Sequence, residues 1–576
     1  MKKLSEFLIK NLKYITLLYV FVVVILILFF TVRGDDFHFH MMRIHAIADE
    51  YRANGFSAFP IRIYSTVLDG YGYACPMFYG DIFLHPFSIL TLFGVSVLNG
   101  YRLMKASVLT VTYIITKNVS KKLYGNSTYA DIFVAIYIIS ATVYGNATGS
   151  AIGRSFAMMF VPLAMAGLYM ILYKRFEYDW LVLGTAVAGL LFSNVLDCLI
   201  CVFALGVIFL FNLRILDKQK FLKLAKAILV FIGLTLWFVL PMIEQMNSQS
   251  FFVTSKKISQ GKNDLSQYTV PFMGIFVPAK VYKKILYVCN MDSSGIIAYM
   301  NDLLVFIFIC IVSLKKYKDI KKDYFIKAML VLLIGFVWFQ TRFFPFEKLK
   351  FFVGTLQFPY RVRIVMAVMA SFICVKLFEI SQSKRIIISI LLMSVYFICL
   401  TCMTTVGAGI ARAVLNGEKY MDYSYAMNDI MGAEYLPEKL MRDDYRYDTN
   451  ILKNHQNKVI CTDSEVSADF KRFNNYSQMN FRNNNGKNKF EIPIIIYKGY
   501  EATYSDSGEV LSINSSKNGL IEISSDRKSA SVEIKYVGTT IQHISEIISL
   551  VFCLGLLGYL LLRQYKVRRL KDSLSN

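Results

Sequence analysis

Long apolar runs recur along this chain and restrict its possible folds more than any other feature. The first lies at Tyr14–Val32, and similar runs follow as far as the C-terminal region. A helix of about 20 apolar residues crosses the ~30 Å hydrocarbon core of a bilayer. Inside lipid the backbone must satisfy its own hydrogen bonds, so such runs are helical. With 55% hydrophobic residues among 576, the sequence predicts a polytopic α-helical membrane protein.

Basic residues define the expected topology. They gather in short segments between the apolar runs, as at Lys117–Lys122, Lys218–Lys226 and Lys315–Lys322. Short cytoplasmic loops carry an excess of Lys and Arg, so we expect both termini inside a bacterial plasma membrane. The net charge of +23 then reflects topology and contact with anionic membrane lipids, rather than nucleic-acid binding.

Twelve transmembrane helices fit this charge pattern. Residues 82–97 are also apolar, but a crossing there would place the Lys117–Lys122 cluster outside, and Pro86 and Gly94 interrupt the run. We therefore expect 82–97 to lie on or dip into the outer surface. The predicted spans are 12–32, 101–119, 129–146, 155–173, 180–196, 197–213, 222–243, 298–314, 326–341, 362–380, 385–405 and 541–563.

A different pattern separates the last two spans. Residues 406–540 contain Asn-rich tracts and short alternating runs such as Phe490–Tyr497 and Ala530–Tyr536, punctuated by turn signals. This pattern predicts an extracytoplasmic β-rich, sandwich-like domain. The expected organisation is thus a bundle at 1–405 with an outer loop at 33–100, the β domain at 406–540, and a final helix with a basic cytoplasmic tail at 541–576.

The decapeptide Gly34–Arg43 carries the strongest functional signal. It follows the first span directly and holds two carboxylates, two histidines and an arginine. Ionisable groups at such a boundary are costly and usually face a polar cavity. Asp36, His40 and Arg43 fall at positions i, i+4 and i+7, on one helical face.

Two interpretations of Asp35 and Asp36 stay open. They could simply cap a helix that begins near Phe37, where the helix dipole favours negative charge. Alternatively, one of them is a general base or a metal ligand at the membrane surface. Asp36 with His40, or His38 with His40, could bind a divalent metal ion, although no ligand signature is complete.

The rest of the outer loop and three helix ends supply further candidates for substrate binding. Aromatic residues and carboxylates alternate in the loop, as sugar rings require, although interfacial belts look similar. Arginines at outer helix ends could bind a lipid phosphate or simply anchor the helix. With the histidines and arginine of the decapeptide, the predicted substrate-binding residues are His38, His40, Arg43, Asp69, Tyr79, Asp81, Arg154, Glu244 and Arg361.

The chain resembles a known group of membrane enzymes. A signal-anchor helix, an acidic motif just outside it and surface-lying helices resemble the GT-C glycosyltransferases, which use polyprenyl-phosphate sugars. The chain is more similar still to the bacterial YfhO-like membrane proteins, including those named as 6-pyruvoyl-tetrahydropterin-synthase-related. The matching stretches are Gly34-Asp-Asp36-Phe-His38, Gly70-Tyr-Gly-Tyr-Ala, Pro76-Met-Phe-Tyr-Gly-Asp81, Leu240-Pro-Met-Ile-Glu244-Gln, Gln357-Phe-Pro-Tyr-Arg361, Glu434-Tyr-Leu-Pro437 and Tyr497-Lys-Gly-Tyr-Glu501-Ala.

The resemblance implies a glycosyltransferase of the cell envelope. By it, Asp36 or Asp35 is the catalytic or metal-binding carboxylate, and a polyprenyl-phosphate-linked sugar is the donor. The acceptor is an envelope glycan or a glycolipid, and a divalent ion is a possible cofactor. Two other functions stay open: a flippase or transporter of envelope precursors, and a non-catalytic scaffold of envelope assembly.

Overall fold

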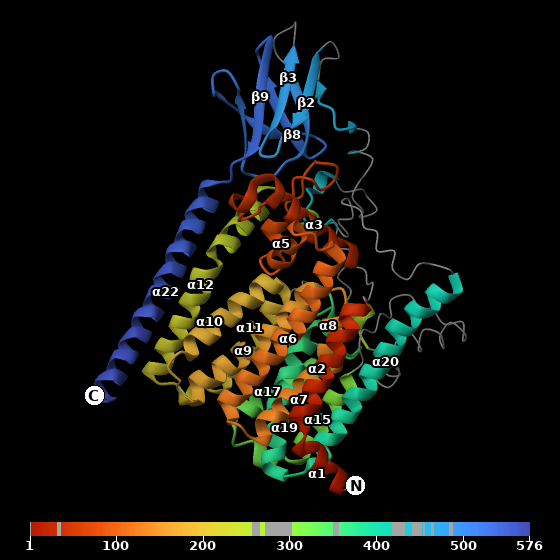
Figure 1. The fold of residues 1–576 in the computed structure, drawn as a ribbon, viewed down its shortest axis with the longest axis vertical. Helices are drawn as coiled ribbons and strands as arrows, with labels where there is room; N and C mark the ends of the chain where they lie inside the picture. Colours follow the sequence, from red (N-terminus) through yellow and green to blue (C-terminus); the bar gives the residue numbers. More distant parts are fainter. Residues whose placement is uncertain are drawn as a thin grey trace.

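The computed structural model describes residues 2–30, 36–174, 176–255, 265–270, 302–349, 356–416, 433–440, 452, 455–461, 466–482 and 488–575. In these ranges the chain forms a helical bundle with a β-rich domain at one end (Figure 1). A long final helix, α22 (Thr540–Ser575), runs from the β-rich domain along the side of the bundle. We call the end of the bundle under the β strands the β-domain end.

Several helices are built to cross a membrane. In the described part of the chain, six are long and apolar enough, and a bent pair at 52° would make a seventh if it crosses as one span. The pair is α7 (Thr128–Ile138) with α8 (Ala141–Thr148). The six are α2 (Leu12–Phe29), α9 (Ile152–Tyr169) with η2 (Met170–Lys174), α12 (Lys218–Ser248), η8 (Pro359–Val362) with α19 (Arg363–Ser381), α20 (Lys384–Asn416) and α22.

Shorter helices occupy four of the other five predicted spans, so the number twelve stays a prediction. Four apolar helices have only 10–17 residues, and a helix of 15 residues is about 22 Å long. They are α10 (Asp179–Ser193), α11 (Val195–Phe211), α15 (Leu303–Lys315) and α17 (Tyr324–Phe339). The remaining predicted span, 101–119, lies within α6 (Val97–Tyr124), which is longer and more polar than these four helices. The fold is that of a multi-pass helical membrane protein.

The loop between α2 and α6 covers the β-domain end. It contains α3 (Phe37–Asn54), η1 (Gly55–Ala58), α4 (Cys75–Phe78) and α5 (His85–Leu92). Helix α5 has 8 residues, about 12 Å, which is too short to cross a bilayer. This agrees with the expectation that residues 82–97 do not span the membrane.

The β strands form two antiparallel sheets. One has the order β1-β4-β8-β7 and the other the order β2-β3-β9-β5-β6. Apolar side chains of both sheets, including Phe481, Phe490, Ile521 and Val532, form a separate buried core, as in a sandwich. The strands are β1 (Ile460–Cys461), β2 (Ser467–Arg472), β3 (Ser477–Arg482), β4 (Asn488–Ile495), β5 (Tyr500–Tyr504), β6 (Val510–Leu511), β7 (Ile513–Ser515), β8 (Leu520–Ser525) and β9 (Ser529–Tyr536).

The β-rich region before the last helix is therefore confirmed. Its predicted first residue, 406, lies within α20, which continues to Asn416. Residues 417–432 lie outside the described part of the chain. The described strands begin only at Ile460, so the domain boundary at 406 stays a prediction.

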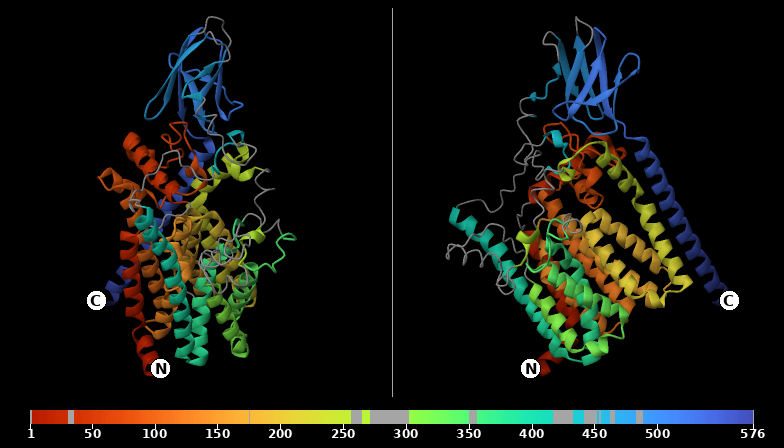
Figure 2. Two further views of the ribbon diagram at one scale, coloured as in Figure 1. Left: turned by 90° about the vertical axis from the view of Figure 1, so that its right-hand side faces the viewer. Right: turned by 180° about the vertical axis from the view of Figure 1, so that it is seen from behind.

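The β-rich domain lies at one end of the bundle (Figure 2), and hydrogen bonds to main-chain carbonyls fasten it there. The Ile495 main-chain amide donates to the Tyr71 carbonyl at 2.9 Å, and Arg472 Nε donates to the Gly70 carbonyl at 3.0 Å. On the α12 side, the Gln249 side-chain amide donates to the Ile496 carbonyl at 2.9 Å. The domain thus lies directly over the loop that carries the candidate site residues.

One carboxylate makes this domain sensitive to acid. Burial raises the pKa of Glu491, but hydrogen bonds from His455, Ser516 and Asn518 outweigh burial and lower it from 4.5 to about 2. A carboxylate with a lowered native pKa stabilises the fold above its unfolded pKa and loses that contribution as it protonates. We expect the protection of β4 and β8 amides from hydrogen exchange, corrected for intrinsic rates, to fall between about pH 4.5 and pH 2.

Glu491→Gln should lower this protection at pH 6 and remove most of its pH dependence. The matched control is Glu522→Gln, since Glu522 lies opposite Glu491 on β8 and pairs with the exposed Lys489. Such exposed pairs contribute little, so the control should keep the acid transition. Equal acid transitions in Glu491→Gln and the unmodified chain would contradict this assignment.

Candidate functional site

Asp36 begins helix α3 at the β-domain end of the bundle. It occupies the N-cap position, where the helix dipole favours a carboxylate, and its carbonyl accepts from the His40 amide at 3.1 Å. Its carboxylate interacts electrostatically with the hydroxyls of Tyr79, Tyr101 and Tyr360. The Asp36 charge therefore acts on residues of three segments: the end of α4, the start of α6 and η8.

Two of the predicted arginines lie around the same tyrosine. The Arg154 guanidinium lies over the Tyr360 ring at 4.9 Å, and Arg361 is the next residue in the chain. Both arginines, Arg363 and Asp36 act electrostatically on the Tyr360 hydroxyl, and Arg361 and Asp36 also act on Tyr79. We call Asp36, Tyr79, Arg154, Tyr360 and Arg361 the Tyr360 cluster.

Asp197, a buried acid that pairs with Arg361 of the cluster, was not among the predicted site residues. Arg361 Nη1 lies 3.8 Å from the fully buried Asp197 carboxylate and donates to Asn194 Oδ1 at 3.3 Å. The same Asn194 oxygen accepts from the amides of Leu196 and Asp197, which caps α11. The polar Ser193-Asn194 break between two apolar runs is the sequence signal that marks this position.

Arg43 contacts Tyr79, one of the residues of the cluster. It is 1% exposed, its Nη2 donates to the carbonyls of Tyr79 and Gly80 at 3.1 and 2.9 Å, and its guanidinium lies over the Tyr79 ring at 4.3 Å. Gly80 has no room for a side chain, because a Cβ there would lie 2.6 Å from the Phe192 carbonyl oxygen. Arg43 thus fixes Tyr79, whereas a substrate phosphate was the predicted partner of its guanidinium.

His40 lies one turn after Asp36 and is buried. Burial lowers the pKa of His40 well below its usual value, and the positive charges of Arg43 and Lys105 lower it further. The imidazole is therefore neutral at physiological pH. Its ring packs edge-on to the Tyr79 ring at 6.1 Å.

Some buried polar atoms at or near the cluster have no hydrogen-bond partner. They include His40 Nδ1, the Tyr101 hydroxyl, Arg361 Nε and both carboxylate oxygens of Asp197, and other such atoms lie elsewhere in the described residues. More than about 90% of buried polar groups in native proteins have a partner.

Asp81 belongs to a separate buried network. Its carboxylate accepts from the Tyr64 hydroxyl at 3.3 Å and lies 3.2 Å from His85 Nε2. His85 Nδ1 in turn lies 2.6 Å from the Tyr51 hydroxyl. These contacts connect α3, the loop and α5, so they give Asp81 a structural role in holding the loop.

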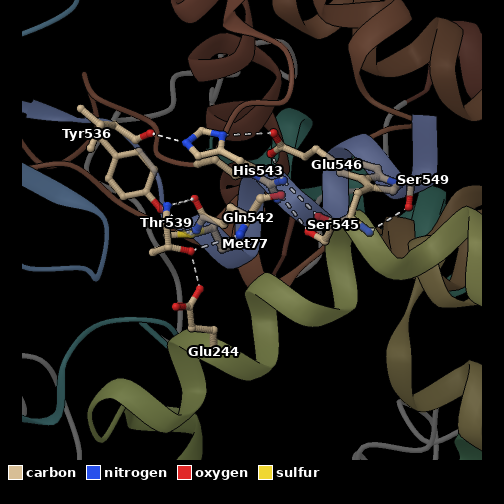
Figure 3. A network of polar contacts seen from close by, with 12 residues as sticks. Met77, Glu244, Tyr536, Thr539, Gln542, His543, Ser545, Glu546 and Ser549 are labelled. Carbon is tan, nitrogen blue, oxygen red and sulfur yellow. Dashed lines mark hydrogen bonds and ion pairs between the residues drawn. The ribbon is translucent and has the colours of Figure 1, made fainter. Parts of the chain in front are cut away.

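Three other predicted residues lie away from the cluster's contacts. Asp69 is exposed, and its carbonyl accepts from Asn457 of the β-rich region. Glu244 accepts from the Thr539 hydroxyl at 2.5 Å, at the start of α22 (Figure 3), and pairs with Lys498 at 3.0 Å. His38 packs edge-on against Phe37. Asp35 lies outside the described residues.

The described residues offer few ligands for a metal ion. Within the described ranges, no three His, Cys, Asp or Glu side chains lie close enough to hold a metal ion. Mg²⁺, however, is often held by one or two carboxylates, waters and substrate phosphates. Asp36 fits that arrangement, with the phosphate of a bound donor completing the site, so a divalent ion stays a prediction.

Comparison with known proteins gives little guidance. No protein-family model matches the chain, and no curated protein does. Among solved structures, the arabinofuranosyltransferase AftD from mycobacteria is similar at 14% sequence identity and a TM-score of 0.28. The match covers 62% of this chain and 27% of that chain, so this chain spans about a quarter of AftD's length.

Proposed function

We propose that the chain is a membrane glycosyltransferase. It moves a sugar from a polyprenyl-phosphate donor to an extracytoplasmic envelope polymer or glycolipid, in the plasma membrane of a bacterium. One observation carries the proposal: the Arg154 guanidinium lies over the ring of Tyr360, next to Arg361, and the charge of the distant Asp36 acts on the same tyrosine. A carboxylate beside two guanidinium groups suits the transfer of a sugar from a phosphate.

The proposed reaction would use the negative charge of Asp36 and the positive charges of Arg154 and Arg361. The acceptor hydroxyl attacks the anomeric carbon, and the bond from that carbon to the phosphate oxygen breaks. The Asp36 carboxylate takes the proton from the acceptor hydroxyl. Arg154 and Arg361 stabilise the negative charge that develops on the leaving polyprenyl phosphate. If a divalent ion is bound, Asp36 and the phosphate would hold it, and the ion would neutralise part of the same charge.

The positions of the buried charges favour a surface site over a transport pathway. Asp197 begins α11, Asp302 precedes α15 and Arg363 begins α19. Lys105 donates to the carbonyls of Asn146 and Gly149 at the end of α8. Asp197, Asp302 and Arg363 thus lie at helix ends, and the Lys105 ammonium reaches one from the third turn of α6. A flippase would need polar groups along its path through the bilayer.

The β-rich domain suits a role in acceptor binding. It lies over the loop that holds Tyr79, fastened through Gly70, Tyr71 and α12. An acceptor chain held between the domain and the loop would present its hydroxyl to Asp36 from the side opposite the membrane.

A deletion strain tests this function. We expect its envelope to lack a sugar that the parent strain contains, and its polyprenyl-phosphate-linked sugar to accumulate on the extracytoplasmic face. Expression of the intact chain should restore both. Accumulation of the lipid-linked precursor on the cytoplasmic face would indicate a flippase instead. An unchanged envelope glycan, with no precursor accumulating, would contradict both functions and favour a scaffold.

A further inference from the structure

A basic cavity lies at the end of the bundle opposite the β domain. Its volume is about 440 Å³, and it is lined by Glu177, Trp180, Gln219, Lys220, Lys223, Lys226 and Arg563. These residues come from the segment before α10 and from α10, α12 and α22, which lie side by side (Figure 1). The volume is within the range of roughly 300–1,000 Å³ that is typical of sites for small molecules.

The lining has a surplus of positive charge. Four of the seven residues are cationic and one is a carboxylate. Glu177 pairs with Arg563, and Lys223 lies 2.7 Å from the buried carboxylate of Asp179. The Lys220 ammonium lies 4.0 Å from the Asp217 carboxylate and donates to the Ile215 carbonyl at 2.7 Å. Lys226 is exposed and makes no ion pair within the described residues; its ammonium lies 5.9 Å from the centre of the Trp180 ring. A ligand with negative charge would therefore balance the site.

The surfaces beside the cavity are apolar. Phe221, Leu222 and Ile228 of α12 are 65%, 54% and 59% exposed, and Leu561 and Leu562 of α22 are 56% and 66% exposed. In a helical membrane protein such residues face the hydrocarbon of the lipid. Trp180, in the first turn of α10, is buried and forms part of the cavity wall. A charged cavity thus directly adjoins a lipid-facing surface.

We propose that this cavity binds the phosphate headgroup of a membrane amphiphile. The phosphate lies among Lys220, Lys226 and Arg563, and the hydrocarbon chains lie along the exposed apolar faces of α12 and α22. Basic pockets between membrane helices on the cytoplasmic side bind anionic headgroups in this way. The site lies at the opposite end of the bundle from the Tyr360 cluster and does not depend on the proposed transferase function.

Titration of the purified full-length chain in neutral detergent tests the proposal. The probes are dioctanoyl phosphatidylglycerol, geranyl phosphate, dioctanoyl phosphatidylcholine and inorganic phosphate, with bound ligand counted by native mass spectrometry. We expect at least one of the two anionic amphiphiles to bind at least about fivefold more tightly than phosphatidylcholine. The tighter of the two identifies the source of the headgroup. Inorganic phosphate that binds as tightly as the amphiphiles would overturn the lipid assignment.

A charge-reversing variant assigns this binding to the cavity. Gln219 and Lys226 are both exposed, so Gln219→Glu/Lys226→Glu should fold normally and bind the preferred amphiphile at least about tenfold more weakly. The matched control, Lys315→Glu/Lys318→Gln, makes the same charge change at exposed positions outside the cavity and should bind like the unmodified chain. Equal losses in both variants would indicate non-specific attraction and overturn the proposal.

Discussion

Replacement of Asp36 by asparagine is expected to lower the rate of glycosyl transfer by about 10³-fold, as the loss of a general base does. Asparagine has nearly the same size and is as good an N-cap as aspartate, so α3 should begin at the same residue. The amide, however, cannot take a proton from the acceptor hydroxyl. The measurement is transfer from a synthetic polyprenyl-phosphate sugar by the purified chain, together with restoration of the envelope glycan in the deletion strain.

Two further variants make this test specific. Asp35→Asn examines the neighbouring carboxylate and should retain most of the activity if Asp36 is the base. Asp49→Asn removes a carboxylate from the same helix, where it pairs with Arg52, and should be fully active. A parental rate in Asp36→Asn and in the double Asp35→Asn/Asp36→Asn variant would exclude a catalytic carboxylate in this motif.

The sequence predicted the general architecture because its signals are local. Apolar length and basic loops identify membrane helices, and alternation identifies the β-rich region after Ile460. The number of crossings does not follow from these signals alone, because α10 and α15 are shorter than a bilayer is thick. Whether a short helix crosses depends on its tilt and neighbours, which its own residues do not encode.

The arrangement of the site could not be predicted in the same way, because it depends on contacts between residues that are far apart in the sequence. The spacing of Asp36, His40 and Arg43 predicted one helical face, but their different roles depend on partners elsewhere in the chain. Arg43 is engaged by the carbonyls of Tyr79 and Gly80, which are invisible in side-chain patterns. The approach of Arg154 to Tyr360 depends on how α9 packs beside η8, since the two are far apart in sequence.

Glu244 shows the same dependence on tertiary contacts. A glutamate at the outer end of a span resembles a substrate ligand in the sequence, but its carboxylate is engaged by Thr539 and Lys498. Its partners belong to the junction with α22, almost 300 residues later, so its interaction is visible only in the folded chain. The same tertiary origin explains why Asp197 was not recognised as the partner of Arg361.

The pair Arg361 and Asp197 allows structural and functional effects to be separated. Arg361→Ala is expected to destabilise the chain by about 3–5 kcal/mol, because it leaves the buried Asp197 carboxylate without its counter-charge. Adding Asp197→Asn removes that charge and should restore most of the stability, measured by thermal unfolding in detergent. Transfer should stay at least about 10²-fold below the parent in both variants, since neither can stabilise the leaving phosphate through Arg361.

A second buried pair serves as the control for this cycle. Arg363 Nη1 and the Asp302 carboxylate are also 3.8 Å apart and buried. Arg363 Nε donates to Gln340 Oε1 at 2.5 Å, as Arg361 Nη2 donates to Gln357 Oε1 at 2.5 Å, so the two arginines have matched surroundings. Arg363→Ala and Arg363→Ala/Asp302→Asn should show the same loss and recovery of stability, with transfer recovering in the double variant as the fold does. If transfer also recovers in Arg361→Ala/Asp197→Asn, Arg361 is a structural residue, and the phosphate must be bound by Arg154 without it.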